Sequence, residues 1–145
     1  MIQVTREPLD PEAITAAVRD DASGGVVTFL GTTRNETGGR RVLYLEYEAY
    51  EDMAGKMLAR IADEVAAKWG IHRASIAHRF GRLEIGEVSL VVAVASPHRV
   101  AAFEACQYVV DRIKENVPIW KKEVFEDGGV WVGLEAGHHA STVST

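Results

Sequence analysis

The sequence predicts an α+β fold in a single domain, with a largely antiparallel or mixed sheet. Strand-like and helix-like segments follow the order β-α-β-β-α-β-β-α-β-β, which lacks the strict alternation of a doubly wound sheet. The hydrophobic fraction of 47% is ordinary for a globular protein, and a chain of this length buries about 68–70% of its unfolded surface. No repeat or linker divides the chain. We therefore expect one domain over residues 1–136 and a disordered tail, small and polar, over residues 137–145.

The first half of the chain contains three predicted strands and two predicted helices. The strands are Ile2–Thr5, Val26–Leu30 and Val42–Tyr50. The second of these, VVTFL, is mostly apolar, and we expect it to be a central strand. The third alternates, and one of its faces is formed by Leu43, Leu45, Tyr47 and Ala49. The helices run from Pro11 to about Asp20, after the cap residue Asp10, and from Glu51 to Trp69, before Gly70.

The second half of the chain is organised around the segment Val88–Glu123. An apolar strand at Val88–Ala95 leads into a helix that Ser96 caps and Pro97 begins. The helix ends near Asn116, because the proline that follows cannot continue it. Spacings of three and four predict its buried face: Val100, Phe103, Cys106, Val110, Ile113 and Val117. We also expect strands at Ser75–Phe80, Trp120–Phe125 and Val130–Leu134, a turn-rich link at Gly81–Glu87, and a tight turn at Glu126–Gly129.

Charge and composition exclude several classes of function. A net charge of −5 argues against a general nucleic-acid binder, because phosphate neutralisation dominates that affinity. The N-terminus lacks the apolar core of a signal peptide, and no apolar run is long enough to span a bilayer. The single cysteine, Cys106, fits a reducing compartment, so we expect a cytoplasmic protein with no membrane partner. There is no Gly-rich phosphate loop and no Cys/His metal spacing, and we expect neither a metal nor a cofactor.

Two clusters of cations break local rules along the long helix of the second half. His98 and Arg99 lie in its predicted first turn, where the helix dipole favours anions and free N–H groups point outward. They form a candidate anion site. Lys114 and Lys121 flank the proline turn, which can bring the two amines into one cleft. Alternatively, His98 and Arg99 are solvated, and the lysines, with Lys122, complement the helix C-terminus.

Two further residues stand out singly. Arg34 lies in the polar loop Gly31–Arg41, close to the preceding strand, so the scaffold can hold it firmly, although solvation is the commoner fate of a loop arginine. His78 lies in a predicted strand and has no partner apparent from the sequence; a lone histidine is more often structural than catalytic. With no thiol nucleophile, triad or metal, covalent chemistry here must use lysine amines or a reactive group brought by a partner.

Five segments carry a resemblance to one protein family. They are FLGTTRN at Phe29–Asn35, LEYEAYEDMA at Leu45–Ala54, HRFGRLEIGE at His78–Glu87, SPHRVAAFEA at Ser96–Ala105 and DRIKENVPIWKKE at Asp111–Glu123. Together these segments resemble the large, catalytic subunit of molybdopterin synthase, the MoaE family, and the resemblance runs from about Gly25 to Trp131. It implies an α/β-hammerhead fold with an additional antiparallel β-sheet.

The resemblance also implies a reaction, sulfur transfer in molybdenum cofactor biosynthesis. A small ubiquitin-like sulfur-carrier subunit (MoaD-like), ending in a Gly-Gly thiocarboxylate, gives its sulfur to cyclic pyranopterin monophosphate to form the dithiolene of molybdopterin. The implied assembly is a homodimer within a heterotetramer. Lys114 and Lys121 match the catalytic lysines. The residues that match substrate-binding positions are Thr32, Thr33, Arg34, His98, Arg99, Lys114, Lys121, Lys122 and Glu123.

An alternative function fits the same sequence. A non-catalytic module that binds an anionic ligand or a carrier-protein tail needs His98, Arg99 and Arg34, but it does not need both lysines. Formation of dithiolene product separates the two functions.

Overall fold

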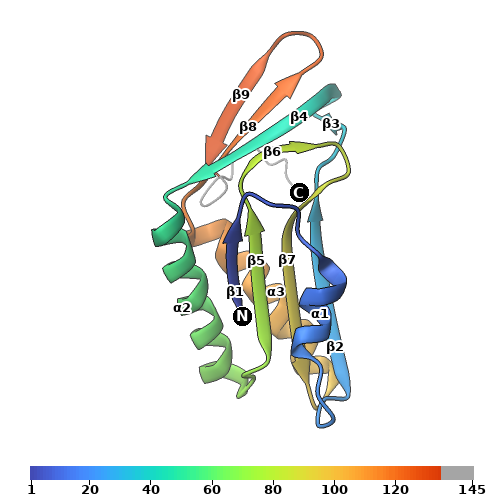
Figure 1. Ribbon diagram of the computed structural model, residues 1–145, viewed down its shortest axis with the longest axis vertical. Coiled ribbons are helices and arrows are strands. Elements are labelled where there is room, and N and C mark those ends of the chain that lie inside the picture. The colour runs from blue at the N-terminus through green and yellow to red at the C-terminus, as the bar shows by residue number, and fades with distance from the viewer. Residues whose placement is uncertain (135–145) are drawn as a thin grey trace.

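Residues 1–134, which the computed structural model describes, form two sheets and three helices (Figure 1). The first sheet contains, in spatial order, β1 (Ile2–Thr5), β5 (Ala74–Arg79), β7 (Val88–Ser96) and β2 (Gly25–Thr32). Only the β1–β5 pair is parallel. The second sheet is antiparallel and contains β3 (Glu36–Thr37), β4 (Arg40–Ala49), β8 (Ile119–Phe125) and β9 (Val130–Leu134), with β6 (Gly81–Glu84) also paired to β4. The predicted α+β fold with an additional antiparallel sheet is confirmed.

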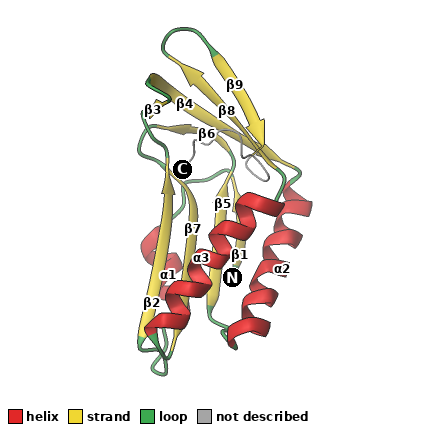
Figure 2. Ribbon diagram, turned by 180° about the vertical axis from the view of Figure 1, so that it is seen from behind, coloured by secondary structure: helices red, strands yellow, loops and turns green. Residues whose placement is uncertain are grey.

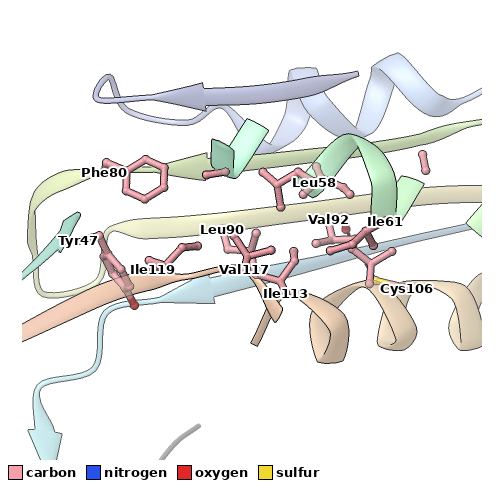
Figure 3. Close-up of a cluster of buried hydrophobic side chains, with 14 of the residues drawn as sticks. Tyr47, Leu58, Ile61, Phe80, Leu90, Val92, Cys106, Ile113, Val117 and Ile119 are labelled. Atoms are coloured by element: carbon pink, nitrogen blue, oxygen red, sulfur yellow. Dashed lines mark hydrogen bonds between the residues drawn. The ribbon is translucent and has the colours of Figure 1, made fainter. Parts of the chain in front are cut away.

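The helices cover both faces of the first sheet. α2 (Glu51–Trp69) and α3 (Arg99–Asn116) lie side by side on one face, and α1 (Pro11–Val18) lies on the other (Figures 1 and 2). Because successive strand residues point to opposite faces, β7 supplies both cores. Leu90, Val92 and Val94 face α2 and α3, whereas Val91, Ala93 and Ala95 face α1. Figure 3 shows the larger cluster, in which Leu58 and Ile61 of α2 and Cys106 and Ile113 of α3 pack on the same face of the sheet.

The first two helices begin and end where the sequence predicts, within two residues. The backbone N–H of Ala13 donates to the Asp10 carboxylate at 3.1 Å, and Pro11 occupies the first turn, where its missing N–H is not needed. α2 ends at Gly70, whose φ of 68° is the left-handed conformation that favours glycine. Both helices are therefore fixed largely by local signals.

The turn from α3 into β8 is held by two side chains that are buried in the core. Val117, the C-cap of α3, and Ile119, the first residue of β8, are both fully buried, and Pro118 between them prevents the helix from continuing. The chain therefore changes direction at a fixed point of the core (Figure 3). The last turn of α3 and the first residues of β8 are held in a defined relation as a result.

The prediction for the start of α3 was wrong by two residues. Ser96 does not cap the helix, because it is buried and pairs with Gly25 as the last residue of β7. The helix instead begins at Arg99, with His98 as its N-cap and no side-chain hydrogen bond from that cap. Strand pairing has overridden the local Ser-Pro signal.

The predicted buried face of α3 was also wrong at its start. Val100 and Phe103 are 61% and 62% exposed. Ala102, Ala105 and Val109 face the sheet in their place, while Cys106, Ile113 and Val117 are buried as predicted. Because alanine side chains are small, they let α3 approach the strands closely. The buried face of α3 therefore contains Ala102 and Ala105, and the larger Val100 and Phe103 lie outside it. Two large apolar residues remain at the surface.

Three strand predictions need correction. Leu43 is 45% exposed and Val42 is buried in its place, because an irregularity in the β4–β8 pairing between Val42 and Tyr44 shifts the alternation. The predicted link at Gly81–Glu87 contains strand β6, which pairs with β4. The apolar strand β2 is not central but lies at an edge of the first sheet.

Within the described residues, no helix is both long enough and apolar enough to cross a bilayer. The expected tail at residues 137–145, with His138 and His139, lies outside the described residues, and the boundary at residue 136 stays a prediction.

One ion-pair cluster joins α2 to α3 and gives stability a defined pH dependence. Glu64 accepts hydrogen bonds from Arg112 Nε at 2.9 Å and from the Tyr108 hydroxyl at 2.6 Å. These bonds, that of Arg112 first, lower the pKa of Glu64 to about 2 from its ordinary 4.5. A lowered pKa stabilises the folded state above the unfolded value, and this stabilisation is lost as pH falls through the folded one.

We therefore expect the free energy of unfolding to fall between about pH 4.5 and pH 2, and Glu64→Gln to flatten that decline. Urea unfolding of both proteins at several pH values measures this. Parallel curves for wild type and Glu64→Gln would show that the cluster contributes nothing to the acid limb.

Candidate functional site

A pocket of about 220 Å³ lies where the C-terminal end of α3 meets both sheets. Its cations are Arg34, Lys114 and Lys121. Its polar lining includes Thr32, Thr37, Tyr47, His78, Ser89 and Glu123, and its apolar walls are Phe29, Leu30, Leu45, Leu90 and Ile113. The predicted meeting of Lys114 and Lys121 in one cleft is thus found in the structure, and Arg34 joins them from the loop after β2.

Lys121 reaches the pocket because of the register between β4 and β8. Lys121 lies directly opposite Tyr47, and Glu123 lies opposite Leu45, so these four side chains share the inner face of the second sheet. Lys122 pairs with Glu46 and therefore belongs to the outer face. It is not among the residues that line the pocket. This is the alternation expected of the strand predicted at Trp120–Phe125.

Lys114 reaches the pocket from the last turns of α3. It precedes the buried turn at Val117 by three residues and follows the buried Ile113 directly. Its side chain is half-buried, so the stem packs beside the core while the amine lies at the pocket wall. Lys114 from α3 and Lys121 from β8 therefore line the same pocket. Complementing the dipole at the end of α3 would not require this arrangement.

Glu123 is a buried carboxylate in this cationic setting. It is 5% exposed, and its Oε2 accepts a hydrogen bond from Thr37 Oγ1 at 2.7 Å. Thr37 belongs to the short strand β3, so this bond ties the β3–β4 hairpin to β8 across 86 residues of sequence. Arg34 lies in the segment leading into that hairpin.

Several pocket residues were not predicted from the sequence, and the most notable are Tyr47 and His78. His78 is 2% exposed, stacks on Phe80 at 4.8 Å between ring centroids, and meets Tyr47 edge-on at 5.3 Å. Its Nδ1 lies 3.0 Å from the carbonyl oxygen of Arg79. The sequence feature that could have identified His78 is its position, because a histidine side chain stands among the buried residues of strand β5. Tyr47 belongs to β4 of the other sheet, so the local sequence pattern did not reveal this contact.

The two threonines predicted to bind substrate, Thr32 and Thr33, have different surroundings in the structure. Thr32 lines the pocket. Thr33 is buried instead, and its backbone N–H and hydroxyl both donate to the carbonyl oxygen of Glu87, at 3.0 and 3.1 Å. Thr33 therefore anchors the loop after β2 to the turn before β7, and it acts on the position of Arg34 more than on a ligand.

His98 and Arg99 lie at the opposite end of α3 from Lys114 (Figure 2). Fifteen residues of helix separate Arg99 from Lys114, which is about 22 Å along the axis. The start of α3 packs instead beside β2: a Cβ added to Gly25 would lie 3.1 Å from Arg99 Cα. One chain therefore carries two separate cationic sites, which the sequence could not place relative to each other.

The pocket is suited to an anion or to a carbonyl group on which negative charge develops. Ammonium and guanidinium groups in a partly dry pocket stabilise such charge more strongly than they would in water. Among the described residues, no three His, Cys, Asp or Glu side chains come together in an arrangement that could hold a metal ion.

The sequence profile of one family, described as MoaE protein, matches residues 4–116. The chain belongs to the MoaE family. It is 50% identical over 131 residues to the molybdopterin synthase catalytic subunit of Bacillus subtilis, covering 90% of this chain and 83% of that one. The crystal structure of molybdopterin synthase from Staphylococcus aureus matches with a TM-score of 0.85 and 45% identity, covering 90% and 95% of the two chains. A MoaE protein from Burkholderia ambifaria matches with a TM-score of 0.80 and 32% identity, covering 97% and 94%.

The tie between Thr37 and Glu123 gives a prediction about stability. Thr37→Val keeps the shape of the side chain but removes the donor to a buried carboxylate. We expect a loss of about 1–3 kcal/mol in the free energy of unfolding, because the desolvated carboxylate loses a partner. Thr37→Ser, which keeps the hydroxyl, is the control. Urea unfolding that gave equal values for Thr37→Val and wild type would contradict the assignment.

Proposed function

We propose that this protein is the catalytic subunit of a molybdopterin synthase. It transfers sulfur from the C-terminal thiocarboxylate of a small ubiquitin-like carrier to cyclic pyranopterin monophosphate, in the cytoplasm. The observation that carries the proposal is the convergence of Lys114 and Lys121 in one narrow pocket, in a chain half identical to a molybdopterin synthase catalytic subunit.

The dimensions of the pocket support entry of a carrier tail. About 220 Å³ is below the range of about 300–1,000 Å³ that is usual for a whole small-molecule site. A Gly-Gly terminus has no side chains and fits such a narrow space, with Phe29, Leu45 and Leu90 as apolar walls. The thiocarboxylate at its end is an anion, and Lys114 and Lys121 attract it.

The charged groups then divide the work. Lys114 and Lys121 stabilise the negative charge that develops on the thiocarboxylate carbonyl, and either amine can return a proton to the leaving oxygen. Arg34 and Arg99 hold the phosphate of the substrate, since the guanidinium fork matches its oxygens. His98, Thr32 and Glu123 complete the substrate contacts. Thr33 and Lys122, which the family resemblance also matches to substrate-binding positions, do not line the pocket, so we assign them no direct contact.

A homodimer reconciles the two cationic sites. Arg99 lies beside the Gly25 end of β2, and the pocket lies beside the Thr32 end, about 23 Å along the strand. If two β2 edges meet antiparallel about a two-fold axis, the Gly25 end of one copy comes beside the Thr32 end of the other. Each pocket then receives His98 and Arg99 from the partner copy.

The surface along β2 supports this pairing. β2 is an edge strand in the part of the chain that the structure describes, and Val26, Phe29 and Leu30 on it are 37–41% exposed. Val100 and Phe103, in the first turns of α3, add two more exposed apolar side chains. An open edge flanked by large apolar residues favours association with another chain.

The binding-module alternative uses the same surface without chemistry. It accounts for Arg34, His98 and Arg99, but it gives no reason for two lysines to share a pocket with a buried glutamate. The catalytic proposal accounts for both cationic sites.

Lys114→Ala tests the catalytic proposal. Alanine keeps helix propensity, so we expect a folded protein that still binds the carrier and forms product about 10²–10³-fold more slowly. Single-turnover assays with thiocarboxylated carrier and cyclic pyranopterin monophosphate measure this. Lys122→Ala is the matched control, and we expect a smaller loss because Lys122 belongs to the outer face of β8. Wild-type rates for Lys114→Ala would favour the binding module.

Mixing two impaired variants tests whether the pocket is completed by a partner copy. Arg99→Ala and Lys114→Ala homodimers should each be impaired. In a mixed dimer, the pocket that keeps Lys114 receives Arg99 from the other chain, so random exchange should restore about a quarter of wild-type activity. Light scattering on the wild type should give a dimer. No recovery after verified exchange would mean that Arg99 acts within its own chain or not at all.

A further inference from the structure

The loop that carries Arg34 is held by the turn between β6 and β7. Arg34 lines the pocket from an exposed position, so its backbone largely determines which way the side chain points. Glu87 is the last residue of that turn and is not among the residues that line the pocket. Resting on the proposed function, in which Arg34 holds the phosphate of the substrate, we propose that Glu87 is the positioning residue for Arg34.

The backbone on both sides of Arg34 is hydrogen-bonded to other segments. On one side, the backbone N–H and the hydroxyl of Thr33 both donate to the carbonyl oxygen of Glu87, at 3.0 and 3.1 Å. The carbonyl oxygen of Thr33 accepts a hydrogen bond from the N–H of Gly86 at 2.8 Å. On the other side, the carbonyl oxygen of Asn35 accepts a hydrogen bond from an N–H of β4 at 2.9 Å. The backbone of Arg34 is therefore held between two bonded residues.

The side chain of Glu87 holds the turn that provides the bonds to Thr33. Its Oε1 accepts a hydrogen bond from the backbone N–H of Glu84 at 2.7 Å, and its Oε2 accepts one from Arg79 Nη1 at 3.3 Å. The backbone N–H of Glu87 donates in return to the carbonyl oxygen of Glu84 at 3.0 Å. Gly86, within the turn, has a φ of 88°, which is the left-handed conformation that favours glycine. The carboxylate therefore links the two ends of a turn to which Thr33 is bonded.

Arg79 connects this turn to the first sheet. It is the last residue of β5, an inner strand, and its side chain is only 13% exposed. Its Nε also donates to the backbone carbonyl oxygen of Arg6 at 3.4 Å, so the guanidinium is held from two sides. A series of contacts thus runs from β5 through Arg79, Glu87 and Thr33 to Arg34. Every step in it is a hydrogen bond or a covalent bond, so a displacement of Glu87 is passed on to Arg34.

Regular strand pairing does not replace Glu87 in this role. The β2–β7 pairing shifts its register between Gly31 and Thr32, and the pair of Thr32 with Val88 is the last of the ladder. An irregularity of this kind changes the direction of the side chains that follow it. Beyond it, the bonds of Thr33 to the turn hold the two segments together, so these bonds determine where Arg34 lies.

The Glu87 position requires a carboxylate for its full effect. The hydrogen bond from the backbone N–H of Glu84, followed by that from Arg79, lowers the pKa of Glu87 below its ordinary value, so the group is ionised at neutral pH. A carboxylate serves both donors, with one oxygen for each. The neutral amide of glutamine has a single oxygen and would retain only one of these bonds.

A double-mutant cycle on the binding of cyclic pyranopterin monophosphate, measured by calorimetry, tests the proposal. Glu87→Ala and Arg34→Ala should each weaken binding about tenfold, which is the scale of one hydrogen bond to a charged group. Because Glu87 acts through Arg34, the double variant should also bind about tenfold more weakly, and not about a hundredfold. Glu87→Gln, which keeps one accepting oxygen, should weaken binding only about threefold. A general loss of stability would not produce this coupling to Arg34.

Glu84→Ala is the matched control. Glu84 belongs to the same turn and forms an ion pair with Arg82 at 2.6 Å, but Glu87 is bonded to its backbone and not to its carboxylate. The Glu84→Ala variant should therefore bind the substrate as tightly as the wild type. A loss equal to that of Glu87→Ala would mean that any change in the turn suffices, and it would overturn the assignment to Glu87.

The outcomes separate this inference from the function on which it rests. If the wild type does not bind cyclic pyranopterin monophosphate, the proposed function fails and this inference fails with it. If the wild type binds it and Glu87→Ala binds it equally well, or if the two losses multiply to about a hundredfold, only the inference fails. Should Glu87→Ala not fold, the cycle is measured with Glu87→Gln. The same loss with and without Arg34 would overturn the inference, and a loss that disappears without Arg34 would support it.

Discussion

The register between β4 and β8 is the constraint on which the pocket depends. Strand side chains alternate, so the pairing of Tyr47 with Lys121 and of Leu45 with Glu123 decides which residues face inward. A slip of one residue would turn Lys121 and Glu123 to solvent and bring Lys122 and Val124 inside. The irregularity between Val42 and Tyr44 and the buried turn at Val117–Ile119 fix this register from its two ends. The pocket is thus held by packing on both sides of the strand pair.

Around this register, the pocket combines two requirements that usually oppose each other. Cations must be close enough to act on one carbonyl group, yet burying like charges together is unfavourable. Here Lys114 and Lys121 remain half-buried, and Glu123 supplies a compensating negative charge that is held by Thr37. Because Thr37 belongs to the β3–β4 hairpin, its hydrogen bond to Glu123 links the position of that hairpin, and of the loop before it that carries Arg34, to the buried carboxylate of the pocket.

Local signals predicted the parts of the fold that local interactions determine. Asp10-Pro11 and Gly70 marked helix ends, and alternation placed Lys121 apart from Lys122. The failures occurred where distant pairing decides. Ser96 stays in β7 because Gly25 pairs with it, Val42 replaces Leu43 through a bulge, and α3 buries alanines in place of Val100 and Phe103. His78 went unassigned for the same reason, since Tyr47 belongs to the other sheet.

The exposed edge of β2 has a consequence for the newly made chain. Edge strands are commonly protected by lysine, proline or inward-pointing charge, and the sequence GVVTFLGT of β2 has none of these. Until another surface covers it, the strand offers unpaired backbone groups beside exposed valine, phenylalanine and leucine side chains. Such an edge is a template for misassembly. The expression level therefore has two opposite effects on misassembly at this edge. At low concentration, a folded chain finds a partner that covers β2 only slowly. At high concentration, unfolded chains compete for pairing with the same edge.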